Sequence, residues 1–149
     1  MKNILPAMAL LISITLQGQY YYNDLIGTKE ISTKMKAFVA ARVQSMTATG
    51  YDPRGSKTTD FNEWQDVQAN GTILKITTRN GQTATRLYYH FDDKTRLISS
   101  RDSTGDIQII TGYTYDASEN LTRIFLTTKD EKQDFNETEE RQWLYTAAG

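Results

Sequence analysis

The stretch "YTYDASENLT" at residues 113–122 decides the fold, because "YHFDDKTRLI" at residues 89–98 has the same pattern. In both, two aromatic residues stand two positions apart, Asp follows the second, and Leu comes five positions after that Asp. Aromatic residues two apart lie on one face of a strand, and Asp in a turn accepts hydrogen bonds from backbone N–H groups ahead of it. Each stretch therefore predicts a turn between two antiparallel strands. The residues that would build these hairpins are Tyr89, Phe91, Asp92, Leu97, Asp116 and Leu121.

Two partial copies extend the repeat. Residues 143–149, "WLYTAAG", have Trp143 and Tyr145 as the aromatic pair. Residues 49–55, "TGYDPRG", form a weaker copy that keeps the Asp. Hairpins that each pack against their neighbour are the economical explanation of such self-similarity.

Strand and turn signals alternate along most of the chain. Apolar and polar residues alternate at 73–78, 87–91 and 121–126, which predicts strands. Asn-Gly pairs at 70–71 and 80–81 tolerate the positive φ of tight hairpin turns. The sequence therefore predicts a mainly β fold, an antiparallel meander of roughly seven or eight strands with one N-terminal amphipathic helix.

The predicted helix spans residues 28–46, where apolar residues recur at the spacing of one helical face. Thr28 is the predicted N-cap, and the lysines lie mostly off the apolar face, where water would solvate them. We expect the apolar face to pack on one side or end of the sheet. That face consists of Ile31, Met35, Phe38, Val39, Val43 and Met46.

The N-terminus has the layout of a secretory signal peptide over residues 1–18, with a positive start, an apolar run over 4–16 and the small residue Gly18. The apolar run is shorter than the roughly 20 residues that span a bilayer as a helix. Cleavage after Gly18 is therefore favoured, with an uncleaved anchor or a buried first helix as the alternative. The mature chain would have an extended segment over 19–27 and a single domain over 28–149.

Amino-acid composition limits which cell compartments and which classes of partner are expected for this protein. The chain has no Cys, so it carries no disulfide and no lipid attached to a Cys. We expect an exported protein, periplasmic or extracellular, with no stable membrane anchor after cleavage. The net charge of −1 shows no basic field, which argues against nucleic acid as a partner.

The sequence contains no recognisable catalytic or metal-binding motif. His90 is the one histidine, and it alternates away from its aromatic neighbours on the predicted strand, which favours a surface role. The sequence has no phosphate-binding loop, nucleophile elbow or zinc-binding helix motif. The acidic segment 130–140 is typical of a solvated hairpin loop. We therefore predict no enzyme, no cofactor and no metal site.

The two hairpin stretches resemble the YD repeat of bacterial RHS-type cell-surface proteins, whose pattern is roughly Tyr-x-Tyr-Asp-x-x-Gly-Asn/Arg-Leu-Thr. Residues 19–30 also look like the mature start of uncharacterised exported bacterial proteins with such repeats. The resemblance implies β-sheet shells, strips or spacers, with activity in other domains. Thr95 and Glu119 replace the Gly of that pattern. A non-Gly residue in the left-handed conformation costs about 1 kcal/mol, so we expect these turns to differ from the family's.

The last copy stops at its turn, which would leave a strand over 138–145 with at most one neighbour. Proteins usually avoid such a free edge. Two interpretations remain open: the chain is part of a longer protein, or this edge pairs with a partner.

Aromatic side chains are the best surface candidates. Aromatic rows on a sheet bind glycans or peptides, but packing in the core explains the same residues. We predict a non-catalytic exported β-repeat protein with a scaffold or envelope-interaction role. The alternative is a glycan- or protein-binding module that uses these aromatics or its last strand. The candidate binding surface comprises Tyr88, Tyr113, Tyr115, Trp143 and Tyr145.

Overall fold

The computed structural model describes residues 22–130, 132 and 135–146. The predicted signal peptide and residues 19–21 lie outside this part of the chain. The helical segments are the π-helical turn η1 (Tyr22–Gly27), the α-helix α2 (Thr28–Ala40) and the 3₁₀ turn η2 (Ala69–Gly71). The strands are β1 (Ser45–Tyr51), β2 (Lys57–Gln68), β3 (Ile73–Asn80), β4 (Thr83–Phe91), β5 (Leu97–Asp102), β6 (Ile107–Tyr115), β7 (Leu121–Asp130) and β8 (Phe135–Gln142).

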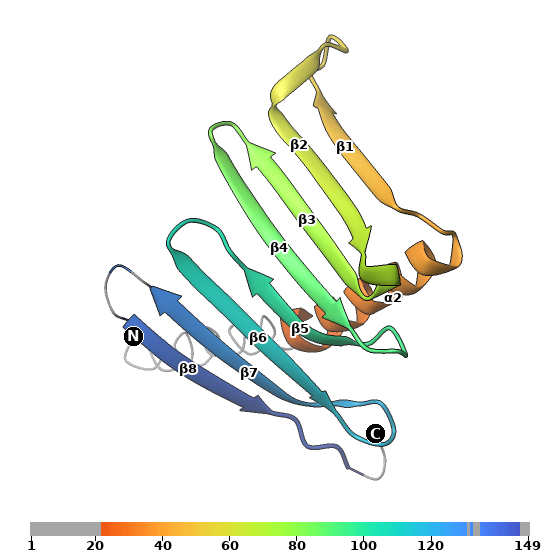
Figure 1. Ribbon diagram of the computed structural model, residues 1–149, viewed down its shortest axis with the longest axis vertical. Coiled ribbons are helices and arrows are strands. Elements are labelled where there is room, and N and C mark those ends of the chain that lie inside the picture. The colour runs from red at the N-terminus through yellow and green to blue at the C-terminus, as the bar shows by residue number, and fades with distance from the viewer. Residues whose placement is uncertain (1–21, 131, 133–134, 147–149) are drawn as a thin grey trace, which may run out of the picture.

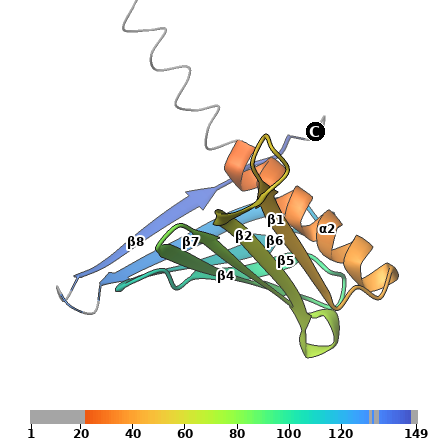
Figure 2. The same cartoon turned by 90° about the horizontal axis from the view of Figure 1, so that it is seen from above.

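The described strands form one antiparallel sheet of eight, in which each strand pairs with its neighbours in sequence. This order confirms the predicted meander, and Figure 1 shows the strands side by side in chain order. The helix α2 lies across one side of the sheet near the strand ends (Figure 1 and Figure 2). We call this side the helix face. The other side, which no helix of the described residues covers, is the open face.

The hydrophobic core lies between α2 and the helix face. Met35 of α2 and Leu74 of β3 are both 0% exposed, and Leu97 of β5 is 1% exposed. Ile76 and Phe91 complete the buried cluster. The core thus joins one helix to the middle strands, and burial of these side chains holds the helix against the sheet.

The helix ends earlier than the sequence predicts. It stops at Ala40, and residues from Ser45 onward belong to β1. Arg42 adopts a left-handed conformation with φ 54°. The N–H of Arg42 donates to the Val39 carbonyl, and the next N–H donates to a carbonyl one residue before Val39. This pair of hydrogen bonds ends a helix. No sequence signal marks the end, because the left-handed residue is Arg and not Gly.

The helix also begins differently. Residues 22–27 form a π-helical turn leading into α2, whereas the sequence predicts an extended segment over 19–27. The residue before Thr28 has helical angles (φ −59°, ψ −41°) and makes no side-chain cap bond, so Thr28 lies inside the helical run. The buried Asp24 carboxylate of this turn pairs with Arg141 on β8 at 2.7 Å. A contact between such distant residues leaves no local signal in the sequence.

The acidic segment is mostly strand. The sequence predicts a solvated loop over 130–140 and a last strand from Thr138, but β8 begins at Phe135 and pairs with β7. Glutamate has a low strand propensity, so pairing with β7 and ion pairs such as Arg123 with Glu140 (2.7 Å) decide the conformation. β8 is an edge of the described sheet, and its charges discourage pairing with another chain.

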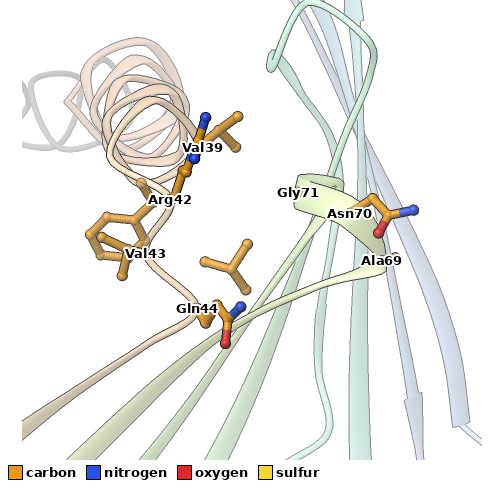
Figure 3. Close-up of a pocket in the computed structure, with 9 residues that line it drawn as sticks. Val39, Arg42, Val43, Gln44, Ala69, Asn70 and Gly71 are labelled. Atoms are coloured by element: carbon orange, nitrogen blue, oxygen red, sulfur yellow. The ribbon is translucent and has the colours of Figure 1, made fainter.

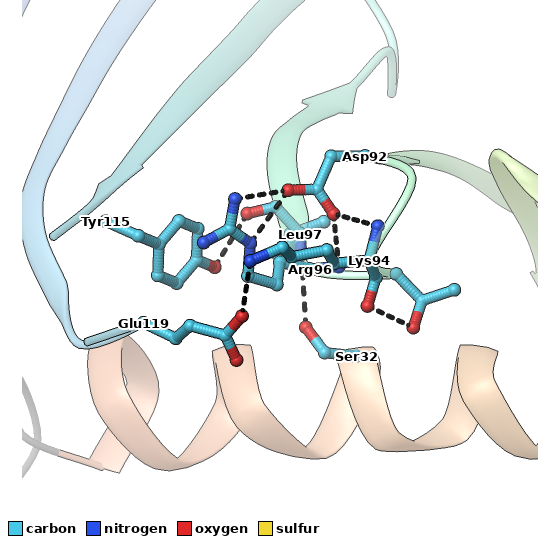
Figure 4. A network of polar contacts seen from close by, with 8 residues as sticks. Ser32, Asp92, Lys94, Arg96, Leu97, Tyr115 and Glu119 are labelled. Carbon is cyan, nitrogen blue, oxygen red and sulfur yellow. Dashed lines mark hydrogen bonds and ion pairs between the residues drawn. The ribbon is translucent and has the colours of Figure 1, made fainter. Parts of the chain in front are cut away.

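Asp92 organises the turn after β4 (Figure 4). Its Oδ1 accepts bonds from the N–H groups of Lys94 (3.0 Å) and Arg96 (2.8 Å). Partial burial acts to raise the pKa of Asp92, but the hydrogen bonds and the charge of Arg96 outweigh it and hold that pKa below its usual value. The N–H of Leu97 donates to the Ser32 hydroxyl of α2 (3.1 Å), which ties this turn to the helix.

The turn after β6 repeats this arrangement. Asp116 Oδ1 accepts a bond from the Asn120 N–H (2.8 Å), and the Asp116 N–H donates to the Asn120 carbonyl, as in the Asp92 turn. Thr95 and Glu119 both take the left-handed conformation, with φ 59° and 68°. The missing Gly therefore does not remove the left-handed residue from either turn, and the strain of a side chain there remains.

A second contact recurs from one hairpin to the next. The Tyr115 hydroxyl donates to the Leu97 carbonyl (2.7 Å), and the Tyr145 hydroxyl donates to the Leu121 carbonyl (2.8 Å). Each bond joins one hairpin to the one before it. The partial copy at 49–55 forms the β1–β2 turn, at the strand ends away from α2 (Figure 1), so it is not in phase with the others.

Thr95→Gly is expected to raise the free energy of unfolding by about 1 kcal/mol, because Gly adopts positive φ without a steric cost. The matched control is Gly55→Thr, at a φ of 81° where no atom lies within 4 Å of an added Cβ. This control should lose about the same amount. Equilibrium urea unfolding measures both variants. Unchanged stability in both would show that the left-handed position carries no strain.

Candidate binding surface

The aromatic residues predicted as a binding surface lie on both faces of the sheet. Tyr88 is on the open face, because both of its neighbours along β4 pack against the core. Tyr113 and Tyr115 are on the helix face, where burial raises the pKa of both phenols. Trp143 and Tyr145 follow β8. The structure therefore brings Tyr88 together with none of the other four.

Cations surround Tyr88 instead. In the sheet register, Lys75 of β3 and Arg101 of β5 stand directly opposite Tyr88 on its two sides. Arg86 is two residues before Tyr88 on the same strand and so points to the same face. Trp64 of β2 stands on this face in the adjacent row. We call Trp64, Lys75, Arg86, Tyr88 and Arg101 the cationic patch.

The sheet separates charge between its two faces. The strand alternation places on the open face the cations Lys75, Arg79, Arg86, Arg101, Arg123 and Lys129. The carboxylates on that face are Asp60, Asp66 and Glu140. On the helix face, the strands carry the carboxylates of Glu63, Asp102, Asp130, Glu137 and Glu139 and the cation Arg141. A net charge near zero therefore conceals an open face with an excess of positive charge.

Asp66 of β2 stands opposite Lys75 in the sheet register, so Lys75 has a carboxylate neighbour on the open face. No carboxylate stands opposite Arg86 or Arg101 in the register of the described strands. In the part of the chain that the structure describes, no ion pair joins Lys75, Arg86 or Arg101 to a carboxylate. The Arg101 guanidinium lies 5.3 Å from the centre of the Tyr88 ring. Such stacking orients a planar cation and lowers the entropy that it loses on binding. The patch thus offers the oriented Arg101 guanidinium and Arg86 to an outside anion, with Lys75 as a third cation beside Asp66.

A hollow beside Trp64 extends the patch towards the far end of the sheet. Its volume is about 310 Å³. An indole ring beside a hydroxyl, an amide and two cations offers both a stacking surface and hydrogen-bonding groups. The residues that line the hollow are Lys57, Thr58, Asn62, Trp64 and Arg79.

No protein-family model, curated protein or solved structure matches this chain. The functional interpretation therefore rests on the geometry of the molecule. Among the described residues, no helix has the length and apolar character needed to cross a membrane. His90 is on the open face between Ile73 and Ser99. No group of three or more His, Asp or Glu side chains in the described ranges is placed to hold a metal ion.

The hollow between the end of α2 and η2 has a different chemistry (Figure 3). Its volume is about 460 Å³, and Arg42 is the one charged residue among those that line it. Gly71 lies so close to the helix that an added Cβ would come within 2.9 Å of Val39 Cγ2. The lining has no carboxylate, hydroxyl or imidazole, so it contains no general base or nucleophile.

The groove between α2 and the repeated turns is lined by four charged residues, of which Arg96 and Glu119 are paired and Lys29 and Lys36 form no ion pair among the described residues. Its volume is about 520 Å³, and Arg96 and Glu119 are among the residues that line it. Arg96 pairs with Asp92 at 2.7 Å, and Glu119 pairs with Lys94 at 2.9 Å. The hydrogen bond from Lys94 lowers the pKa of Glu119. Arg96 and Glu119 thus stabilise the turns, and the open face, which sets three cations around one aromatic ring, is the better candidate surface.

Of the five residues of the patch, only Tyr88 is predicted from the sequence as a surface residue. A signal exists for the others, since Lys75 stands between two buried residues of β3 and must point away from the core. The same alternation places Arg86 and Tyr88 outward on β4. What the sequence lacks is the register that sets β3, β4 and β5 side by side.

Proposed function

We propose that this protein is a non-catalytic, exported β-sheet protein that binds an anionic partner of the cell envelope through its open face. The observation that carries the proposal is the set of three cations around Tyr88, none of them in an ion pair among the described residues, on a face that no described helix covers. Export rests on the predicted signal peptide, and an envelope role extends the predicted scaffold or interaction role.

Unlike Arg123, which pairs with Glu140, the patch cations Lys75, Arg86 and Arg101 form no ion pair among the described residues. Ionic side chains that stabilise this fold are paired, as Arg141 is with Asp24 and Arg96 with Asp92. A hydrogen bond between charged groups contributes about 1.5–3 kcal/mol to the free energy of binding when the contact excludes water. An anionic partner would therefore gain affinity from side chains that the folded chain leaves unpaired.

A scaffold role is the second candidate function. The Tyr115 and Tyr145 hydroxyls make equivalent contacts from one hairpin to the one before it. Equivalent contacts between successive hairpins are the way in which a repeat protein builds a strip. The edge strand β8 is a weaker binding site than the open face, because its carboxylates oppose pairing with another strand.

Sedimentation with purified cell-envelope fragments tests the proposal. The open-face variant, with three cations of the patch reversed, is expected to bind at least about tenfold more weakly than the wild type. A helix variant with the same change of charge should bind as the wild type does. Equal loss in both variants, or no loss in either, would contradict the proposal. The open-face variant carries Lys75→Glu, Arg86→Glu and Arg101→Glu, and the helix variant carries Lys29→Glu, Lys34→Glu and Lys36→Glu.

A further inference from the structure

We infer that the partner of the open face is an acidic polysaccharide whose sugar rings meet Trp64 and whose carboxylates meet the cations beside Tyr88. This inference rests on the proposed function and names its ligand class. It follows from the different chemistry at the two ends of the patch.

The end around Trp64 suits a sugar ring. Trp64 is 36% exposed, and its direct neighbours across the sheet are Thr47 and Thr77. The hollow beside it adds the amide of Asn62 and the hydroxyl of Thr58. An apolar ring beside a hydroxyl, an amide and the cations Lys57 and Arg79 matches an acidic sugar, which has an apolar C–H face, a rim of hydroxyls and a carboxylate.

The end around Tyr88 suits carboxylates. The Arg101 guanidinium lies over the Tyr88 ring, 5.3 Å from the ring centre. Its planar set of N–H donors can bind a carboxylate in a bidentate pair of hydrogen bonds. Lys75 and Arg101 flank Tyr88 from opposite strands, so they are two strand spacings apart, or about 10 Å. Two separated cations on a flat face favour a polymer with repeated negative groups over a small anion.

Single-stranded nucleic acid fits this face less well. Proteins that bind single-stranded nucleic acid present several aromatic rings on which successive bases stack. Here the Arg101 guanidinium lies over the Tyr88 ring, and the Arg123 guanidinium lies 5.9 Å from the Phe125 ring centre. Trp64 is then the main stacking surface of the patch. One stacking surface beside several cations matches an acidic sugar chain better than a run of bases.

Titration calorimetry with oligogalacturonate tests the inference, with an uncharged glucan and a single-stranded thymidine oligomer of similar length as comparison ligands. We expect binding of oligogalacturonate that weakens with added salt, and no binding of the glucan. Trp64→Ala should weaken binding about tenfold, since it removes the sugar-stacking surface. Arg101→Lys, which keeps the charge but loses the planar fork, should weaken it several-fold. Trp143→Ala, outside the patch, should bind as the wild type does.

Two outcomes would overturn the inference while the proposed function stands. One is equally tight binding of the thymidine oligomer, or Trp64→Ala binding as the wild type does, because the face would then attract any polyanion. The other is no binding of oligogalacturonate by a protein that still sediments with envelope fragments in a patch-dependent way. Failure of the proposed function gives a different result: the open-face variant sediments as the wild type does. Salt-sensitive self-association of the wild type in light scattering, lost in the open-face variant, would assign the face to a second copy and overturn the inference.

Discussion

Met35→Ala is expected to lower the free energy of unfolding by about 3 kcal/mol. Met35 is 0% exposed and is the residue that α2 contributes to the buried core cluster. Leu74, which belongs to the same cluster on the sheet, is also 0% exposed. Truncation removes buried apolar area and leaves a cavity that a sheet held by its hydrogen bonds fills only in part. Equilibrium urea unfolding gives the free energy directly.

The chain provides a matched control for this variant. Met46 lies on β1 and is 37% exposed, so Met46→Ala loses little buried area and is expected to cost less than about 1 kcal/mol. A difference of about 2 kcal/mol or more between the two variants supports the core as described. Equal effects would mean that α2 does not pack on the sheet through Met35.

Arg141→Met should cost about 2–3 kcal/mol, because it leaves the Asp24 carboxylate buried without its cation. Asp24 has a side chain that is 6% exposed, and its Oδ1 lies 2.7 Å from Arg141 Nη1. The hydrogen bond to Glu139, and to a smaller extent the one to Asp24, raises the pKa of Arg141. The guanidinium is therefore charged throughout the accessible pH range. The loss should appear in urea unfolding near neutral pH.

Two further variants separate a buried pair from a surface pair. Arg123→Met breaks an ion pair whose side chains are 49% and 33% exposed, so it should cost less than about 1 kcal/mol. Asp24→Asn added to Arg141→Met should recover part of the loss, because no buried charge remains. If Arg141→Met and Arg123→Met cost the same, the Asp24 contact does not hold η1 to β8.

The hairpin repeat was accessible from the sequence because its information is local. Asp92 and Asp116 each bond to backbone N–H groups within four residues, so the pattern around them is enough to place the turns. Long-range contacts leave no comparable pattern in the local sequence. The conformation of the segment around Asp24 depends on Arg141, which follows it by 117 residues. The strand β8 likewise depends on pairing with β7 more than on its own residues.

The candidate surface was less accessible for the same reason. Alternation shows that Lys75 and Tyr88 point to the side away from their buried neighbours, but only the register shows that they stand opposite each other. Net charge is a sum over both faces, so it could not reveal a positive open face. The sequence also does not state which face the helix covers, and Tyr113 therefore looked like a surface candidate although it packs against the core.

The two tryptophans of the chain offer a direct measurement of where a ligand binds. Trp64 belongs to the cationic patch, whereas Trp143 lies beyond the end of β8. In a nitrogen–proton NMR titration with oligogalacturonate, we expect the indole N–H signal of Trp64 to shift while that of Trp143 stays in place. A shift of the Trp143 signal with Trp64 unchanged would place the ligand away from the open face and rule out the cationic patch as its binding site.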